Sequence, residues 1–257
     1  RAEARRQREV WVRGGEQNAQ TTHEPTQART RSRRRSAPKP SGRSEVAPFI
    51  AMDVLRDARA LESSGQRILH LEVGQPGAPT PEGVRDAVGH ALAEGRIGYT
   101  EALGTTPLRD RISRHYRDRY GVDVPASRIV VTTGSSAAFV LSFLAAFDAG
   151  DRVALPSPGY PAYANILKAL GLETVWLETD ERTRWAPTPE LLDEAAAGGA
   201  LNGILVASPA NPSGTVIEPD QMEALMARAR DLGLWFISDE IHHGLTSGSL
   251  LSPAYAA

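Results

Sequence analysis

The feature that most constrains this chain is an alternation of short apolar segments with helical segments between residues 128 and 239. Short apolar strands that alternate with helices form a mainly parallel sheet covered on both faces. We therefore expect an α/β fold, a three-layer sandwich around a mainly parallel sheet. The predicted strands are 128–133, 152–156, 173–178, 203–208 and 234–239, and the predicted helices between them are 135–147, 162–170, 189–197 and 219–233.

The segment before this alternation has a mixed pattern. Apolar residues at helical spacing predict helices over 46–62 and 81–95, and RILHLEVG predicts a strand over 67–74. A third helix is predicted over 106–120, where Thr106 can cap the helix and the proline that follows suits its first position.

Charge separates the first 44 residues from the rest of the chain. Residues 1–44 hold eleven arginines, one lysine and four glutamates, a net charge of +8, which leaves −10 for residues 45–257. The first segment has too little apolar surface to offset the entropy of ordering. We expect a disordered Arg-rich tail over 1–44 and one folded domain over 45–257. Such a tail can also be a targeting or nucleic-acid-binding arm, or the product of a wrong start site.

Composition excludes several classes of protein. The chain has no cysteine, which excludes disulfides and thiolate metal sites. It has no apolar run of the length that spans a membrane and no secretory signal core, and its net charge is −2. We expect a cytoplasmic protein without a membrane or nucleic-acid partner.

Polar residues follow four of the predicted strands, and ligands of parallel sheets bind at these strand ends. Ser135 and Ser136 open a helix, where backbone N–H groups and hydroxyls favour a phosphate. Tyr160, between two prolines, can hold a ring against a flat ligand. Asn211 presents its amide, and Asp239 needs a partner such as a protonated ring nitrogen or a helix N-terminus. Taken singly, the two serines are better explained as a helix cap and Tyr160 as a packed side chain, and turn chemistry alone explains Asn211.

A metal site is a weaker interpretation of the last cluster. Asp239, Glu240, His242 and His243 lie within five residues, and adjacent side chains rarely point at one ion. We expect no metal.

The order of these motifs is more specific than any one of them, and it resembles the class I/II aminotransferases, which are fold-type I enzymes dependent on pyridoxal 5'-phosphate (PLP). The resemblance covers residues 45–246 and is carried by six segments. They are LEVGQPGAPTPEGV at 71–84, YTEALGTTPLRDRI at 99–112, TTGSSAAF at 132–139, PSPGYPAY at 156–163, SPANPSGTV at 208–216 and ISDEIHHGL at 237–245. The last two are the most specific.

The resemblance implies a role for each strand-end residue. Ser135 and Ser136 would hold the cofactor phosphate, and Tyr160 would stack on the pyridine ring. Asn211 would bond the phenolic oxygen of the ring, and Asp239 would pair with the protonated ring nitrogen.

Two further residues take their roles from the resemblance alone. Gly74 would lie near the substrate carboxylate, and Tyr99 would reach the phosphate across a homodimer interface. The implied substrates are an amino acid and a 2-oxo acid.

Two departures from the family pattern matter. Where the family usually has tyrosine, His242 would contact the phenolic oxygen, and Asp-Glu-Ile-His occurs in related C–S β-lyases. The family's Schiff-base lysine lies about 30 residues beyond the Asp, whereas this sequence continues for 18 residues beyond Asp239. The two lysines present are Lys39, in the tail, and Lys168, on a predicted helix surface.

We therefore expect an incomplete PLP-dependent transferase large domain, truncated before that lysine, with no catalytic residue of its own. The first hypothesis is an aminotransferase that is inactive as given. The alternatives are a C–S β-lyase and a non-catalytic pseudoenzyme or gene remnant.

Overall fold

The computed structural model describes residues 39–75, 77–95 and 98–246. The chain divides into two units at Lys39 and Pro40, and the fold described below belongs to the second. Residues 1–38 of the predicted tail lie outside the described residues, so the tail stays a prediction. Within the described ranges no helix has the length and apolarity needed to cross a membrane.

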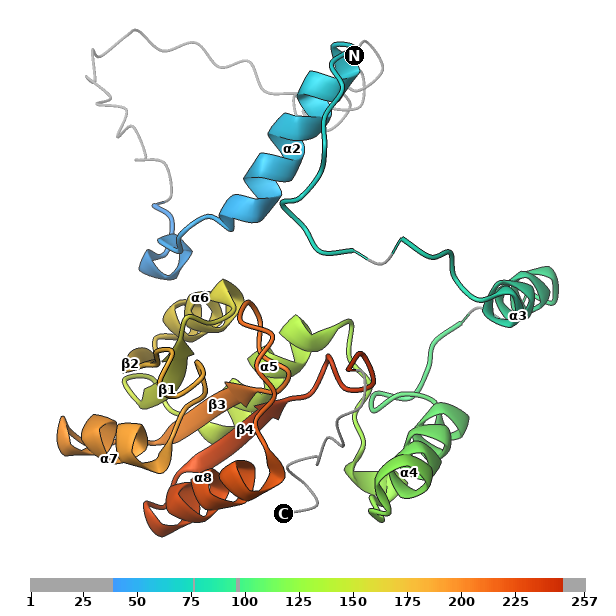
Figure 1. Ribbon diagram of the computed structural model, residues 1–257. Helices are drawn as coiled ribbons and strands as arrows, with labels where there is room; N and C mark the ends of the chain where they lie inside the picture. Colours follow the sequence, from blue (N-terminus) through green and yellow to red (C-terminus); the bar gives the residue numbers. More distant parts are fainter. Residues whose placement is uncertain (1–38, 76, 96–97, 247–257) are drawn as a thin grey trace, which may run out of the picture. The chain divides into compact units, whose positions relative to one another are not determined.

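The sheet has four parallel strands in the order β2-β1-β3-β4 (Figure 1). They are β1 (Arg152–Ser157), β2 (Glu173–Glu178), β3 (Gly203–Ala207) and β4 (Trp235–Asp239). In the pairing of β3 with β4, Gly203 lies opposite Trp235 and Ala207 lies opposite Asp239. Both strands therefore end at the same level, and the loops that follow them start side by side.

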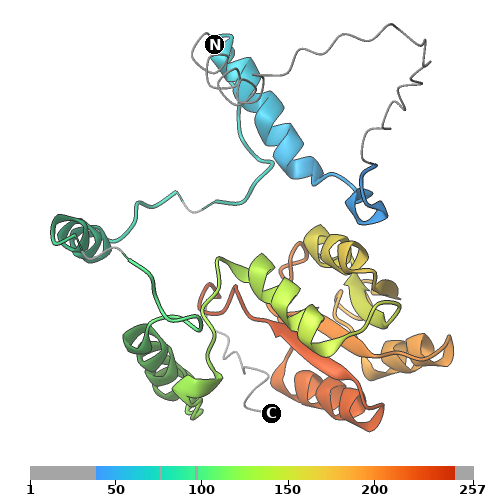
Figure 2. The same cartoon turned by 180° about the vertical axis from the view of Figure 1, so that it is seen from behind.

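Helices cover both faces of the sheet, as the predicted three-layer sandwich requires (Figures 1 and 2). Helices α5 (Ser135–Ala146) and α6 (Pro161–Leu170) pack on one face, and α7 (Pro189–Ala197) and α8 (Pro219–Asp231) pack on the other. Side chains alternate between the faces along a strand. Val153 and Leu155 accordingly point to α5 and α6, whereas Ala154 points to α7 and α8.

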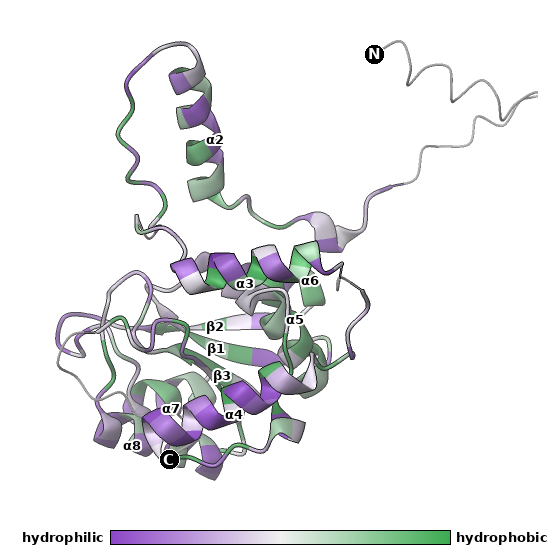
Figure 3. Ribbon diagram, turned by 90° about the vertical axis from the view of Figure 1, so that its right-hand side faces the viewer, coloured by the Kyte–Doolittle hydropathy of each residue, from purple (hydrophilic) through white to green (hydrophobic). Residues whose placement is uncertain are grey.

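The remaining described helices precede α5 in the chain. They are η1 (Gly42–Ser44), α2 (Ile50–Ser63), α3 (Glu82–Ala93), α4 (Thr106–Tyr120) and η2 (Ala126–Arg128). Figure 3 shows α4 as largely hydrophilic, in contrast to the hydrophobic residues of the strands. Thr106 is the first helical residue of α4 and Thr105 is its N-cap, one residue earlier than the sequence predicts.

Two predicted strands are absent from the described structure, those over 67–74 and 128–133. Ile129, directly after η2, has an extended backbone, and the N–H of Val131 donates to the carbonyl of Leu103 at 2.9 Å. Gly104 permits this approach, because a Cβ there would lie 2.5 Å from the Val131 side chain. An apolar extended segment becomes a strand only where a neighbouring strand pairs with it, and neither segment pairs with one of the four described strands.

We expect the Leu167→Ala variant to lose about 2–5 kcal/mol of unfolding free energy, because it leaves a cavity in the core between α6 and the sheet. Leu167 is fully buried. Leu144→Ala is the matched control, since Leu144 is helical too but 62% exposed. Chemical denaturation followed by circular dichroism measures both. Equal losses in the two variants would contradict this packing.

Candidate functional site

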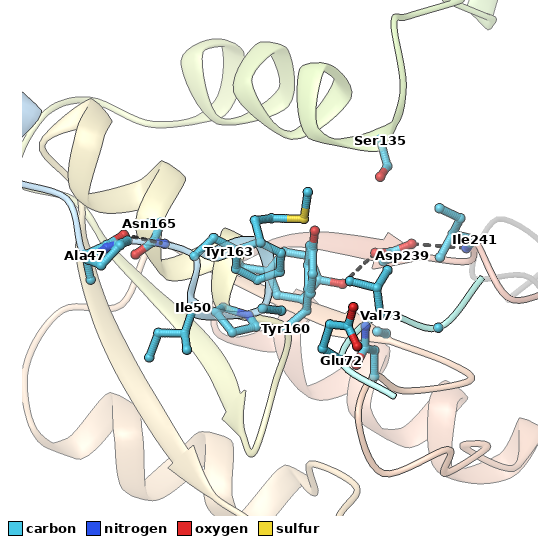
Figure 4. A pocket seen from close by; sticks show the side chains of 18 of the residues that line it. Ala47, Ile50, Glu72, Val73, Ser135, Tyr160, Tyr163, Asn165, Asp239 and Ile241 are labelled. Carbon is cyan, nitrogen blue, oxygen red and sulfur yellow. Dashed lines mark hydrogen bonds between the residues drawn. The ribbon is translucent and has the colours of Figure 1, made fainter. Parts of the chain in front are cut away.

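A cavity of about 740 Å³ lies where the carboxyl ends of β3 and β4 meet the start of α5 and α6 (Figure 4). Six of the eight residues singled out from the sequence line it: Gly74, Ser135, Tyr160, Asn211, Asp239 and His242. The other two are not among its described lining residues. Ser136 is exposed on α5, and the side chain of Tyr99 is fully exposed.

Asp239, the last residue of β4, supplies a buried carboxylate to this cavity (8% exposed). Its Oδ1 accepts a hydrogen bond from the backbone N–H of Ile241 at 3.0 Å. Its Oδ2 accepts one from the hydroxyl of Tyr163 at 2.5 Å (Figure 4). A buried carboxylate is costly unless it is hydrogen-bonded, and these two donors satisfy both of its oxygens.

Tyr163 is one of the cavity residues that the sequence analysis did not single out. It lies one turn into α6, three residues after Tyr160, so both side chains project from the same side of the helix start. Burial, and then the hydrogen bond to Asp239, raise the pKa of Tyr163 well above its ordinary value of 10.0. The hydroxyl therefore stays protonated and acts as a permanent donor to the carboxylate. The spacing of the two tyrosines indicates that they share one side of the helix, but it does not predict the hydrogen bond from Tyr163 to Asp239.

Tyr160 forms an aromatic wall of the cavity. Its ring meets the ring of Tyr163 edge-on, with centroids 5.3 Å apart, and that of Phe49 edge-on at 5.7 Å. Edge-to-face contacts of this kind fix the orientation of a ring. The residue is the N-cap of α6, where Pro161 begins the helix, so the backbone on its C-terminal side is also held.

Asn211 and His242 come from the two loops that follow β3 and β4. The bonds Ser208–Pro209 and Asn211–Pro212 are both cis. The Nδ1 of His242 donates to the carbonyl oxygen of Pro209 at 3.2 Å, which joins the two loops. In the neutral ring Nε2 is then an acceptor, and it becomes a donor when the ring is protonated.

Ser135 begins α5 and lines the cavity. Gly134 precedes it with φ 85°, a left-handed conformation that glycine adopts without strain. The first N–H groups of a helix lack partners within the helix and carry a partial positive charge. The start of α5 is therefore the part of this cavity best suited to an anion.

A second charged group in the cavity is Glu72, which the sequence did not single out. Its Oε1 lies 2.6 Å from Nδ1 of His70, and Nε2 of His70 lies 3.0 Å from Glu62. The hydrogen bond with Glu72, and then that with Glu62, raise the pKa of His70 above 6.5. The His70 bond lowers the pKa of Glu72 in turn. Only Glu72 of these three lines the cavity.

Neither lysine of the chain lines the cavity. Lys168 is exposed in the last turn of α6, as its surface position in the sequence predicted, and Lys39 precedes η1. Among the residues that the structure describes, no group of three or more His, Asp or Glu side chains is arranged to hold a metal ion.

The cavity residues belong to a sequence and a fold that match known proteins. The profile of the family described as "Aminotransferase class I and II" matches residues 66–257. Valine–pyruvate aminotransferase from Mycobacterium tuberculosis is 46% identical over 203 residues, which are 79% of this chain and 52% of the relative. Aspartate aminotransferase from Thermotoga maritima is 32% identical over 79% of this chain and 53% of its own.

Solved structures agree with this similarity. An aminotransferase from Mycobacterium tuberculosis superposes with a TM-score of 0.80 at 44% identity, covering 85% of this chain and 56% of that protein. Aspartate aminotransferase from Thermus thermophilus with maleate superposes with a TM-score of 0.81 at 28% identity. The match covers 85% of this chain and 57% of that protein. The chain thus spans about half the length of the curated relatives it matches.

We expect the nuclear magnetic resonance titration of His70 to have its midpoint above 6.5, because both ring nitrogens face carboxylates. A raised pKa means that this contribution to stability is complete below pH 6.5 and is lost as pH rises through the folded-state value. Glu72→Gln should move the midpoint back toward 6.5. A midpoint that does not move in this variant would contradict the pairing.

We expect Tyr163→Phe to lower the unfolding free energy by about 1.5–3 kcal/mol, because it removes a hydrogen bond to a charged group. Tyr120→Phe is the control. It removes the hydrogen bond between the Tyr120 hydroxyl and Nδ1 of His243 at 3.0 Å, which should cost about 0.5–1.5 kcal/mol. Urea denaturation at neutral pH compares them, and a smaller loss in Tyr163→Phe than in Tyr120→Phe would refute the charged bond.

Proposed function

We propose that this chain, which belongs to the family of class I and II aminotransferases, builds the site that holds PLP for the transfer of an amino group from an amino acid to a 2-oxo acid. One observation carries the proposal. A buried carboxylate, a fixed aromatic ring, an amide, an imidazole and a helix N-terminus line one cavity at the carboxyl ends of parallel strands.

The residues fit a flat, anionic cofactor with a basic ring nitrogen. The family uses PLP. Asp239 accepts hydrogen bonds from Ile241 and Tyr163, and its carboxylate would also accept one from a protonated ring nitrogen. Tyr160 offers a ring face, and the start of α5 at Ser135 suits a phosphate.

When bound, PLP accepts electrons from the α-carbon of the substrate. The chain's own residues would support this in separate ways. Asp239 would keep the ring nitrogen protonated, Tyr160 would hold the ring plane, and Asn211 and His242 would face the phenolic oxygen. Gly74 would leave room for the substrate carboxylate, since no atom lies within 4 Å of where its Cβ would be.

Turnover needs a group that moves the α-proton, and a lysine does this in the family. Neither of the two lysines in these 257 residues is among the residues that line the cavity. We therefore propose that the residues described here bind the cofactor and do not complete the reaction by themselves. Failure to bind PLP at all would instead favour the pseudoenzyme or gene-remnant alternative.

A C–S β-lyase is the second candidate, and His242 is the observation that favours it. The imidazole lines the cavity, with its Nδ1 engaged by the Pro209 carbonyl. Release of pyruvate and ammonia from cystathionine by the complete enzyme would support this candidate, whereas amino transfer to a 2-oxo acid would support the first.

We make three further proposals, the first from the resemblance and the other two from the charge and composition of the chain. The complete protein forms a homodimer in which Tyr99 reaches the phosphate of the partner, which agrees with the full exposure of that side chain here. The Arg-rich segment 1–44 is a tail, and 45–257 form the cofactor-binding domain. The protein acts in the cytoplasm.

The test is binding of pyridoxamine phosphate, a form of the cofactor that needs no lysine, followed by fluorescence. We expect Asp239→Asn to weaken binding by about 10- to 100-fold, because it removes a charge-assisted hydrogen bond. Asp231→Asn, at the exposed end of α8, is the control and should bind like the unaltered chain. Equal affinities for the three proteins would rule out Asp239 as the partner of the ring nitrogen.

A further inference from the structure

One side of the cavity is not used by the residues proposed to hold the cofactor. It is formed by the start of α2, where Phe49, Ile50 and Met52 line the cavity, and by Val73 and Glu72 from the segment before Gly74 (Figure 4). We call these five residues the substrate wall. Four of them are apolar, and Ile50 and Met52 are 71% and 50% exposed.

Contacts with α6 hold the start of α2 at the cavity. The amide Nδ2 of Asn165 donates to the carbonyl oxygen of Ala47 at 3.3 Å. The ring of Phe49 meets the ring of Tyr160 edge-on at 5.7 Å. The wall therefore lies directly beside Tyr160, the aromatic residue proposed to hold the cofactor ring. Its residues Glu72 and Val73 directly precede Gly74, which is proposed to lie near the substrate carboxylate, so a bound amino acid would face the wall.

The charge of the wall is negative. Glu72 lines the cavity and its partner His70 also contacts Glu62. With His70 protonated these three groups carry a net charge of −1, and with His70 neutral they carry −2. Asp239 adds a further negative charge. None of the described lining residues is a lysine or an arginine.

These observations favour one class of substrate. An apolar side chain gains by covering Ile50 and Met52, since it removes apolar surface from water. A side chain that carries a carboxylate would lie in the same cavity as Glu72, and no described lysine or arginine lines that cavity to offset the two charges. Like charges in one cavity repel each other even where water partly screens them. The ammonium group of an amino acid, in contrast, is attracted.

We propose that the substrate wall accepts amino acids with apolar side chains, and that Glu72 excludes those with a side-chain carboxylate. The inference rests on the proposed function, since it concerns the substrate of the same site. It assigns Glu72 as a specificity-determining residue, a role distinct from that of the groups that face the cofactor.

The test uses stable adducts that need no lysine: N-phosphopyridoxyl derivatives of L-valine, L-asparagine and L-aspartate. Asparagine has nearly the shape of aspartate without its charge, so the pair separates charge from polarity. We expect the affinity to fall in the order valine, asparagine, aspartate, with about tenfold between asparagine and aspartate at low salt. An aspartate adduct that binds as tightly as the asparagine adduct would overturn the proposal.

Two matched variants locate the effect. Glu72→Gln should bring the asparagine-to-aspartate ratio close to one. Glu62→Gln, which also removes a carboxylate from His70 but not from the cavity, should keep most of the ratio. Equal changes of the ratio in both variants would show that Glu72 has no special role and would overturn the assignment.

Binding of pyridoxamine phosphate, which has no amino-acid part, separates this inference from the function on which it rests. If pyridoxamine phosphate binds and the three adducts bind with equal affinity, the wall does not select side chains and only the inference fails. If neither pyridoxamine phosphate nor any adduct binds, the proposed function and the inference both fail.

Discussion

The pairing of Ala207 with Asp239 at the end of the β3–β4 ladder is the constraint on which the site depends. The ladder continues for one more bond, from the N–H of Ser208 to the carbonyl of Asp239 at 3.1 Å. Ser208 is buried, and its hydroxyl accepts from the N–H of Ile217 at 3.0 Å. A slip of one residue would turn Asp239 to the other face of the sheet. The register of β3 and β4 therefore determines which face of the sheet the Asp239 carboxylate occupies. The loops after these two strands start side by side, and the hydrogen bond from His242 to Pro209 joins them.

Burial of Asp239 is tolerated because the fold supplies its donors from two different elements. The N–H of Ile241 comes from the turn directly after the strand, which any chain with this turn would offer. The hydroxyl of Tyr163 comes from α6, 76 residues earlier in the chain. The second donor exists only if α6 packs correctly on the sheet, where Leu167 anchors it from the next turn. The core and the site thus share helix α6. A loss of packing around Leu167 would therefore also weaken the hydrogen bond from Tyr163 to the carboxylate of Asp239.

The sequence predicted the parts of this structure that depend on local patterns or on motif order. The alternation of strands and helices after residue 150, and the convergence of Tyr160, Asn211, Asp239 and His242, needed no knowledge of long-range contacts beyond the rule that strand ends meet. Ser135 also lines the cavity, although the strand predicted before it is absent from the described structure. The strand predicted over 128–133 was wrong because an apolar extended segment says nothing about whether a partner lies beside it. Tyr163 was missed for a related reason. An aromatic residue one helical turn after another is typical of a core, and only the fold shows that its hydroxyl reaches a carboxylate.

The distribution of charge around the cavity also explains how its parts divide their tasks. Asp239 and Glu72 make two sides negative, and the start of α5 is the described part with a positive character. In the proposed site, an anionic group of the ligand would be directed toward Ser135 and a cationic ring nitrogen toward Asp239, so a ligand with both would have one favourable orientation. The edge-on contacts of Tyr160 then fix the plane between these two ends. The opposite electrostatic character of Asp239 and of the start of α5 would thus orient the proposed ligand, and the substrate wall would contact what the ligand carries beyond its ring.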